Sequence, residues 1–172
     1  MKKRYDGNQR GQIKLSFSMI FSIILIVVFL AVAFYAIRTL FGVQDSAQVG
    51  IFGNDLQSDI DRIWRSSEGS QALEYNLPSE ISHVCFVDFS EGEVGRGDSS
   101  NIYPELKFYN VGDRNLFFYP PGSSELEGIK IKNINLGEIT RNDNPFCLEV
   151  SNGKLEMRLL KKFGEALVIV EK

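Results

Sequence analysis

The chain has 172 residues, and its 19 lysines and arginines against 22 aspartates and glutamates give a formal net charge of −3 at pH 7. Residues 1–14 hold five basic residues and one acid, which leaves 14 basic against 21 acidic residues, a net charge of about −7, for the rest of the chain. Proteins that bind nucleic acids display a basic patch or stripe. We therefore expect no nucleic acid among the partners.

An apolar run occupies residues 15–37, LSFSMIFSIILIVVFLAVAFYAI, and contains no charged residue. At about 1.5 Å per residue, a helix of this length measures roughly 35 Å, which is enough to cross a hydrocarbon layer of about 30 Å. A removable secretory signal is the alternative, but its apolar core usually has about 7–15 residues and ends at a small-residue cleavage site. The run predicts a transmembrane helix, with the lipid bilayer as a partner.

The charge asymmetry around this run predicts its orientation. Residues 1–14 are polar and basic, and they lack the apolar surface needed to fold by themselves, so we expect a cytoplasmic leader. Basic residues beside a membrane span remain in the cytoplasm. The expected location is the plasma membrane, with the N-terminus in the cytoplasm and residues 39–172 outside.

The residues before the apolar run, Arg10, Gly11 and Gln12 followed by IKLSF, resemble the class III signal peptides of archaeal type IV pilins. The resemblance implies cleavage between Gly11 and Gln12 by a prepilin-type peptidase, and other pilin-like subunits as partners. The family pattern has serine and glutamate at the third and fifth mature positions, where this chain has Lys14 and Ser16. The region also resembles the anchors of uncharacterised membrane proteins of small-genome archaea.

The buried terminal ammonium of such a filament needs a nearby carboxylate, because burying an uncompensated ion costs several kcal/mol. Lys14 adds a second positive charge, and Ser16 provides no negative charge to balance it. We therefore expect no filament built from this chain alone through a buried helix bundle.

Residues 38–66 contain apolar side chains at the spacing of an amphipathic helix. Gly42, Gly50 and Gly53 each cost a helix about 1 kcal/mol relative to alanine, which predicts a kink or a break near residues 50–54, with Asn54 or Asp55 capping a second segment. A helix that leaves the membrane and packs on a sheet is the pilin arrangement that the resemblance implies. The alternative is a stalk that spaces the remaining domain from the lipid.

Residues 67–172 read as a β-rich domain. Residues 66–71 and 90–101 predict loops, and Asn152-Gly153 is a strong hairpin signal. The predicted strands comprise residues 81–89, 106–110, 115–120, 128–136, 146–150, 155–163 and 166–170, and the segments at 106–110 and 115–120 form a hairpin through residues 111–114. The expected fold is α+β: a long N-terminal transmembrane helix continues into an amphipathic helix and packs on an antiparallel β-sheet of about six strands.

Cys85 and Cys147 both lie in predicted strands, and their surroundings lack the Cys or His spacing of a structural zinc site. An exported domain meets an oxidising environment, so we expect the two residues to form a disulfide. The closed loop, 147 minus 85 or 62 residues, would stabilise the domain by about 4 kcal/mol. Two buried free thiols are the alternative.

Candidate catalytic and ligand-binding residues have plainer structural explanations. His83 is the single histidine, and no nearby nucleophile and acid suggest a triad, so we expect a structural role and no enzymatic activity. The glycines at 92, 95 and 97 do not follow the dinucleotide-binding spacing. The tripeptide at 96–98, Arg-Gly-Asp, reads as a surface turn.

The acidic and aromatic clusters also have structural explanations. The acids at 91, 93, 98 and 143 do not match a calcium-loop spacing and read as solvated loops, and we expect no metal or other cofactor. The aromatic residues at 108, 109 and 117–119 read as core of adjacent strands.

These features together favour a pilin-like, membrane-anchored cell-surface protein with a structural or interaction role. The alternative is a signal-anchored extracytoplasmic binding domain that does not assemble. An anchored hydrolase is a minor alternative.

Overall fold

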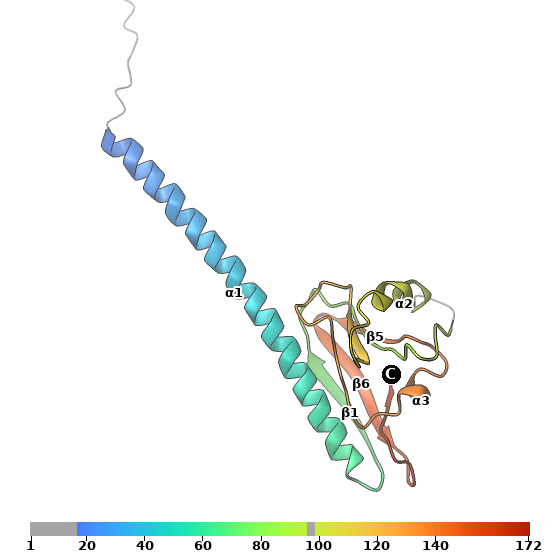
Figure 1. Ribbon diagram of the computed structural model, residues 1–172. Coiled ribbons are helices and arrows are strands. Elements are labelled where there is room, and N and C mark those ends of the chain that lie inside the picture. The colour runs from blue at the N-terminus through green and yellow to red at the C-terminus, as the bar shows by residue number, and fades with distance from the viewer. Residues whose placement is uncertain (1–16, 96–98) are drawn as a thin grey trace, which may run out of the picture. The chain divides into compact units, whose positions relative to one another are not determined.

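A computed structural model describes residues 17–95 and 99–172, without the side chains of residues 40–44, 99 and 100. The chain divides into two units, Met1–Phe41 and Gly42–Lys172 (Figure 1). The first helix, α1 (Phe17–Trp64), has residues in both units. Each unit is described by itself below.

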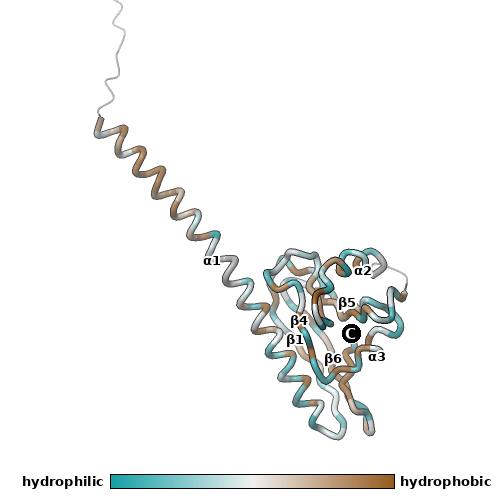
Figure 2. The backbone as a smooth tube through the Cα atoms, viewed as in Figure 1, coloured by the Kyte–Doolittle hydropathy of each residue, from teal (hydrophilic) through white to brown (hydrophobic). Residues whose placement is uncertain are grey.

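The first unit contains an apolar helical stretch, Phe17–Thr39, with a mean hydropathy of 3.0 and no buried residues (Figure 2). This 23-residue helix is long and apolar enough to cross a membrane, a length and composition that signal sequences share. Hydroxyl groups within it bond back to carbonyls one turn earlier: Ser22 Oγ donates to Ser18 O at 2.8 Å, and Thr39 Oγ1 to Tyr35 O at 3.0 Å. The predicted apolar helix is confirmed for its described residues.

The second unit is built on a seven-stranded sheet in which all strand pairs are antiparallel. The strand order is β1-β6-β5-β2-β3-β4, and β7 pairs with β6 beside β5. The strands are β1 (Gly69–Asn76), β2 (His83–Phe86), β3 (Leu116–Tyr119), β4 (Gly128–Ile129), β5 (Phe146–Ser151), β6 (Lys154–Lys161) and β7 (Ile169–Glu171). Two short helices, α2 (Ser99–Lys107) and α3 (Leu136–Ile139), complete the unit. This confirms the α+β class and the antiparallel sheet.

The part of α1 within this unit packs on one face of the sheet. Its buried side chains recur every three or four residues and are Val49, Phe52, Leu56, Ile60 and Ile63. They form one apolar cluster with side chains from each of the seven strands, among them Tyr75, Phe118 and Leu159. The helix is therefore a structural layer of the domain, and a spacer stalk is not what these residues form.

The predicted break near residues 50–54 is wrong, since α1 is helical through Gly50 and Gly53. Helical stability in proteins comes mainly from packing an apolar face, and here that burial outweighs the glycine cost of about 1 kcal/mol each. Near the glycines, Phe52 is on the buried face of the helix, whereas its neighbour Ile51 is 60% exposed.

The opposite face of the sheet carries a second apolar cluster under α2. Side chains alternate along a strand, so Val84 and Phe86 of β2 face α1 while Cys85 faces α2. The same alternation in β3 directs Phe117 toward Ile102 and Leu106 of α2. The central strands are thus buried on both faces, between two helical layers.

Four loop and strand predictions were wrong. Residues 106–110 form the end of α2 and a turn, because Leu106 packs with Ile102 on the sheet. Residues 90–101 already include the start of α2, and β1 begins at Gly69, inside the predicted loop 66–71. Residues 128–136 contain only the two-residue β4 and the first residue of α3.

The hairpin prediction at Asn152-Gly153 is confirmed. These residues connect β5 to β6, with Ser151 opposite Lys154. Their φ angles are 53° and 72°, the left-handed values that a two-residue hairpin turn requires.

Candidate functional site

The predicted leader-cleavage residues, Gly11 and Gln12, lie outside the described residues, as do Lys14 and Ser16. The predicted leader site therefore remains a prediction from the sequence.

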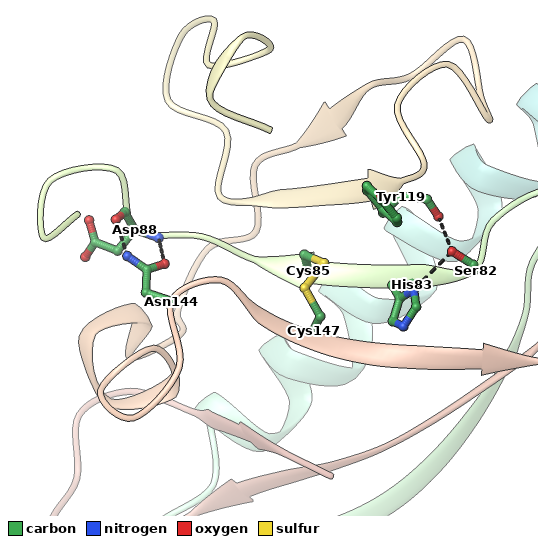
Figure 3. The surroundings of a disulfide bond; sticks show 7 residues. All are labelled: Ser82, His83, Cys85, Asp88, Tyr119, Asn144 and Cys147. Atoms are coloured by element: carbon green, nitrogen blue, oxygen red, sulfur yellow. Dashed lines mark hydrogen bonds between the residues drawn. A yellow bond between two sulfur atoms is a disulfide. The ribbon is translucent and has the colours of Figure 1, made fainter. Parts of the chain in front are cut away.

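A disulfide joins Cys85 of β2 to Cys147 of β5, as the sequence predicts (Figure 3). The two residues lie directly opposite each other, with Cα atoms 4.0 Å apart. Val150 N donates to Ser82 O, so these two residues, which lie opposite each other, form a hydrogen-bonded pair. Hydrogen-bonded and non-hydrogen-bonded pairs alternate along the ladder, and Cys85 and Cys147 lie three pairs away. The cysteines therefore form a non-hydrogen-bonded pair, where the strands approach most closely. Cys85 is fully buried among the residues under α2. This burial and the loop that the bond closes identify a structural crosslink.

His83 lies two residues before the disulfide and has a local hydrogen bond only. Its Nδ1 atom is 3.0 Å from the Ser82 hydroxyl oxygen (Figure 3). That hydroxyl donates its proton to Tyr119 O at 3.1 Å. The imidazole packs edge-on against Tyr119, with ring centroids 6.1 Å apart. Within the described part of the chain, no carboxylate hydrogen-bonds to this ring. Ser82 and His83 therefore lack the third member of a nucleophile, base and acid triad there.

A fully buried asparagine, Asn144, organises the acidic loop after β2. Its Nδ2 atom donates to the carbonyl oxygens of Asp88 at 2.6 Å and Gly92 at 2.5 Å, and its Oδ1 accepts from Asp88 N at 3.0 Å. Its backbone pairs with Val94 in both directions. The sequence analysis missed this residue, for which the only local signal was the Asn-Pro dipeptide that marks a turn.

The acids considered for calcium do not converge in the described residues. No group of three His, Cys, Asp or Glu residues there is arranged to hold a metal ion, while Asp98 lies outside that part. The Arg-Gly-Asp tripeptide at 96–98 falls outside it as well. Asp88 Oδ1 instead accepts hydrogen bonds from the backbone and hydroxyl of Ser90, at 2.9 and 2.6 Å.

The aromatic cluster divides into two parts. Phe117 and Phe118 are buried on opposite faces of β3, as a core role predicts. Phe108 is 87% exposed, so the core prediction was wrong for this residue. It follows the last residue of α2, where the chain leaves the helix in a turn.

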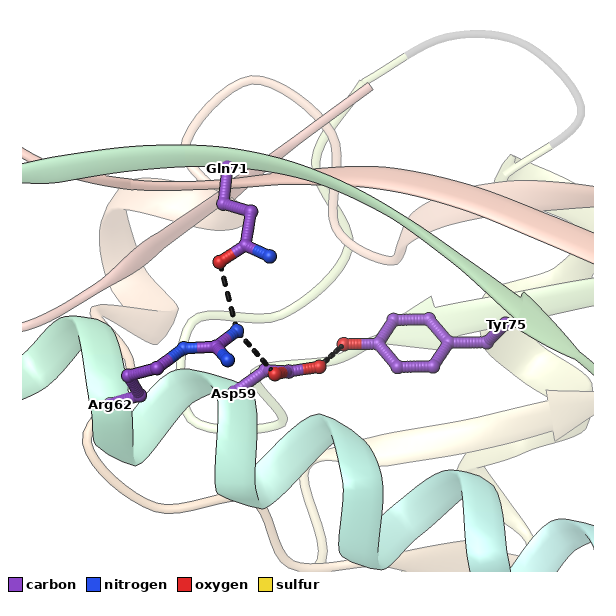
Figure 4. Close-up of polar contacts among 4 residues, drawn as sticks. All are labelled: Asp59, Arg62, Gln71 and Tyr75. Atoms are coloured by element: carbon purple, nitrogen blue, oxygen red, sulfur yellow. Dashed lines mark hydrogen bonds and ion pairs between the residues drawn. The ribbon is translucent and has the colours of Figure 1, made fainter.

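A polar network connects α1 to β1 (Figure 4). Asp59 accepts from the Tyr75 hydroxyl at 2.8 Å and from Arg62 Nη2 at 2.5 Å, and Arg62 donates further to Gln71 Oε1 at 2.8 Å. Burial and the bond to Asp59 raise the pKa of Tyr75 above its usual range. The network aligns α1 antiparallel to β1, because later helix residues meet earlier strand residues.

A groove of about 460 Å³ runs between α1 and residues 126–133. Gln57 and Asp61 line it, and both bond to the opposite wall: Gln57 Oε1 accepts from Lys132 N, and Asp61 accepts from Asn133, each at 2.8 Å. Gly53 lets this wall approach closely, since a Cβ atom there would lie 2.9 Å from Ile129 Cδ1. Gln57 and Asp61 therefore hold α1 to residues 126–133.

Comparisons with family models, with curated proteins and with solved structures find no match for this chain.

Proposed function

We propose that this chain is a pilin-like, membrane-anchored surface protein that acts through contact or assembly and not through catalysis. The observation that carries the proposal is the stretch Phe17–Thr39, which is predominantly apolar and has no buried residues. An exposed apolar surface of this length is unfavourable in water and suits a hydrocarbon layer. The compact unit Gly42–Lys172 follows it directly.

Two further observations support an external location for that unit. The basic residues cluster before the apolar stretch, and positive charge is retained in the cytoplasm. The Cys85–Cys147 disulfide is the kind of bond that persists outside the reducing cytosol. We therefore infer a plasma-membrane location with the N-terminus in the cytoplasm.

The pilin-like part of the proposal rests on Gly11 and Gln12 and on a helix that packs against an antiparallel sheet. A prepilin-type peptidase and other pilin-like subunits are the partners it implies. Lys14 and Ser16 favour a second candidate, an anchored binding domain that does not assemble, because they leave a processed terminus without a balancing carboxylate.

The intact mass of the protein purified from membranes tests the proposal. Loss of residues 1–11 supports the pilin-like role, whereas full retention of the leader supports the anchored binding domain. Gly11→Leu is the matched variant, since a bulky residue at the cleavage position blocks a peptidase that requires a small one. If wild type and Gly11→Leu have the same unprocessed terminus, the pilin-like role is wrong.

Topology is tested separately with a membrane-impermeant protease on intact cells. We expect digestion of residues 42–172 and protection of the apolar stretch. Complete protection of the second unit would contradict the external location.

A further inference from the structure

β1 is an edge strand with few of the features that prevent pairing with another chain, and its one charged side chain, Glu74, forms an ion pair with Lys154 of β6. Among the described residues it pairs only with β6, through eight consecutive residue pairs from Gly69–Lys161 to Asn76–Lys154. It contains no proline, lysine or bulge, the devices with which proteins commonly protect such edges.

The hydrogen bond just beyond β1 shows which backbone groups point outward. Leu77 N donates to Gly153 O at 2.8 Å in the same register, so Leu77 occupies a hydrogen-bonded position. These positions alternate in an antiparallel ladder, so the odd-numbered residues of β1 bond to β6. The outward N–H and C=O groups belong to Ser70, Ala72, Glu74 and Asn76, and within the described part of the chain nothing bonds to them.

A hollow of about 170 Å³ lies beside this edge, between α1 and residues 74–76. The helix contributes Gln48, Ile51 and Asp55 to its wall. The Ile51 side chain is 60% exposed and gives the hollow an apolar wall. Asp55 is also exposed and has no hydrogen bond or ion pair among the described residues.

Ile51 and Asp55 are separated by about 6 Å along α1, since four residues rise about 1.5 Å each. Side chains at positions i and i+2 of a strand share one face and lie about 6.6 Å apart. Because α1 runs along β1, a strand added at the edge would present two successive side chains of one face to these two residues. An aliphatic side chain complements Ile51, and a lysine or arginine complements Asp55.

We propose that the outer edge of β1 binds an extended segment of a partner protein as an additional strand, with an aliphatic and a basic residue two positions apart on the face toward α1. Backbone hydrogen bonds supply the affinity in this mode, and alternate side chains supply the specificity. The proposal rests on the interaction role inferred above and names the class of partner. A second copy is a poorer occupant, because twofold pairing of two β1 strands makes the α1 helices antiparallel and directs the two Gly42 ends oppositely.

The test uses the full chain in phospholipid nanodiscs and a fluorescent peptide, TVTKTVTK, whose valines and lysines alternate on one face. We expect saturable binding by fluorescence anisotropy and binding at least about tenfold weaker for TVTETVTE, in which glutamate meets Asp55. Asp55→Lys should reverse this preference. Equal binding of the two peptides to both proteins, or no saturable binding up to about 1 mM, overturns the proposal.

Ala72→Pro tests the backbone contribution. Proline removes an outward N–H and leaves the bonds to β6 in place, while the matched variant Ala72→Thr retains that N–H. We expect Ala72→Pro to weaken TVTKTVTK binding about tenfold and Ala72→Thr to change it less than about twofold. Circular dichroism and disulfide content establish that each variant is folded, and the Asp55→Lys result decides the question if Ala72→Pro is not.

Two outcomes separate this proposal from others. If the chain sediments as a dimer that Ala72→Pro dissociates, the occupant is a second copy and the partner proposal is wrong. If the chain does not insert into nanodiscs, the proposed membrane anchor is wrong, but the strand-addition proposal is not affected. Peptide binding is then measured with the chain in solution.

Discussion

Lys161 of β6 donates hydrogen bonds from its ammonium group to Trp64 O at 2.6 Å, at the last residue of α1, and to Ser66 O at 2.8 Å. The final carbonyls of a helix have no amide partners within it and carry partial negative charge. The lysine is 9% exposed, so these carbonyls replace much of its hydration. This side chain therefore joins the C-terminal end of α1 to β6.

Replacing Lys161 with methionine should lower the free energy of unfolding by about 1.5–3 kcal/mol, because it removes hydrogen bonds from a charged group and leaves carbonyls unpaired. Lys162→Met is the matched control, since that neighbouring lysine is exposed, and it should change stability by less than about 0.5 kcal/mol. Urea denaturation in detergent can be followed through Trp64, the single tryptophan. Equal effects of the two substitutions would contradict the assigned role.

The double variant Cys85→Ala and Cys147→Ala should lose about 4 kcal/mol of stability relative to the oxidised wild type, because the bond closes a loop across 62 residues of sequence separation. Both residues are replaced so that no free thiol remains. Reductant should destabilise the wild type and leave the double variant unchanged in the same denaturation experiment. An unchanged wild type under reducing denaturation would show that the bond is absent in the protein as isolated.

The glycines of α1 should respond differently to alanine. A Cβ atom at Gly50 would meet nothing within 4 Å, so Gly50→Ala should gain about 1 kcal/mol of helix propensity. At Gly53 the same atom would lie 2.9 Å from Ile129 Cδ1, and Ile129 would have to move. Gly53→Ala should therefore be less stable than Gly50→Ala by thermal or urea denaturation. The reverse order would argue against close packing of α1 on β4.

Tyr75→Phe should change the dependence of stability on alkaline pH. Burial and the bond to Asp59 raise the pKa of Tyr75, so above about pH 10 the unfolded chain releases this proton first. The folded state then binds more protons, and the wild type loses up to about 1.4 kcal/mol per pH unit from this group as the pH rises. Urea titrations from pH 8 to pH 11, about the range of tyrosine ionisation, should show a shallower decline for Tyr75→Phe. At neutral pH the variant should be about 1 kcal/mol less stable than wild type.

The regular patterns of this sequence predicted the elements whose stability is local or periodic. The charge-free run predicted the apolar helix, and Asn152-Gly153 predicted the β5–β6 hairpin from its turn geometry alone. Cys85 and Cys147 were predictable as a pair because both lay in recognisable strands.

The errors arose where tertiary contacts replace local preference. Residues 128–136 have the alternating isoleucines of a strand, yet Ile131 bonds through its backbone to the side chain of Asn115, with distances of 2.8 and 2.9 Å, instead of to a neighbouring strand. The end of α2 was taken for a strand because its aromatic residues suit either structure. Alternation along β6 places Lys161 on the same face as Leu155 and Leu159, but no local pattern reveals the carbonyls that it binds. No local pattern reveals that Asn144 is buried, since its partners lie far away in the sequence.

The pairing of β1 with β6 sets an order of events during synthesis of the chain. It joins residues 69–76 to residues 154–161, so β1 has no neighbour in the sheet until residues 154–161 have been made. Contacts this distant in sequence form slowly, because a long loop must close before they are rewarded. The apolar face of α1 is synthesised early and stays uncovered until β6 and β7 have been made. An apolar face that is uncovered during this interval favours aggregation, and loss of residues 154–161 should abolish folding of the domain and not only shorten it.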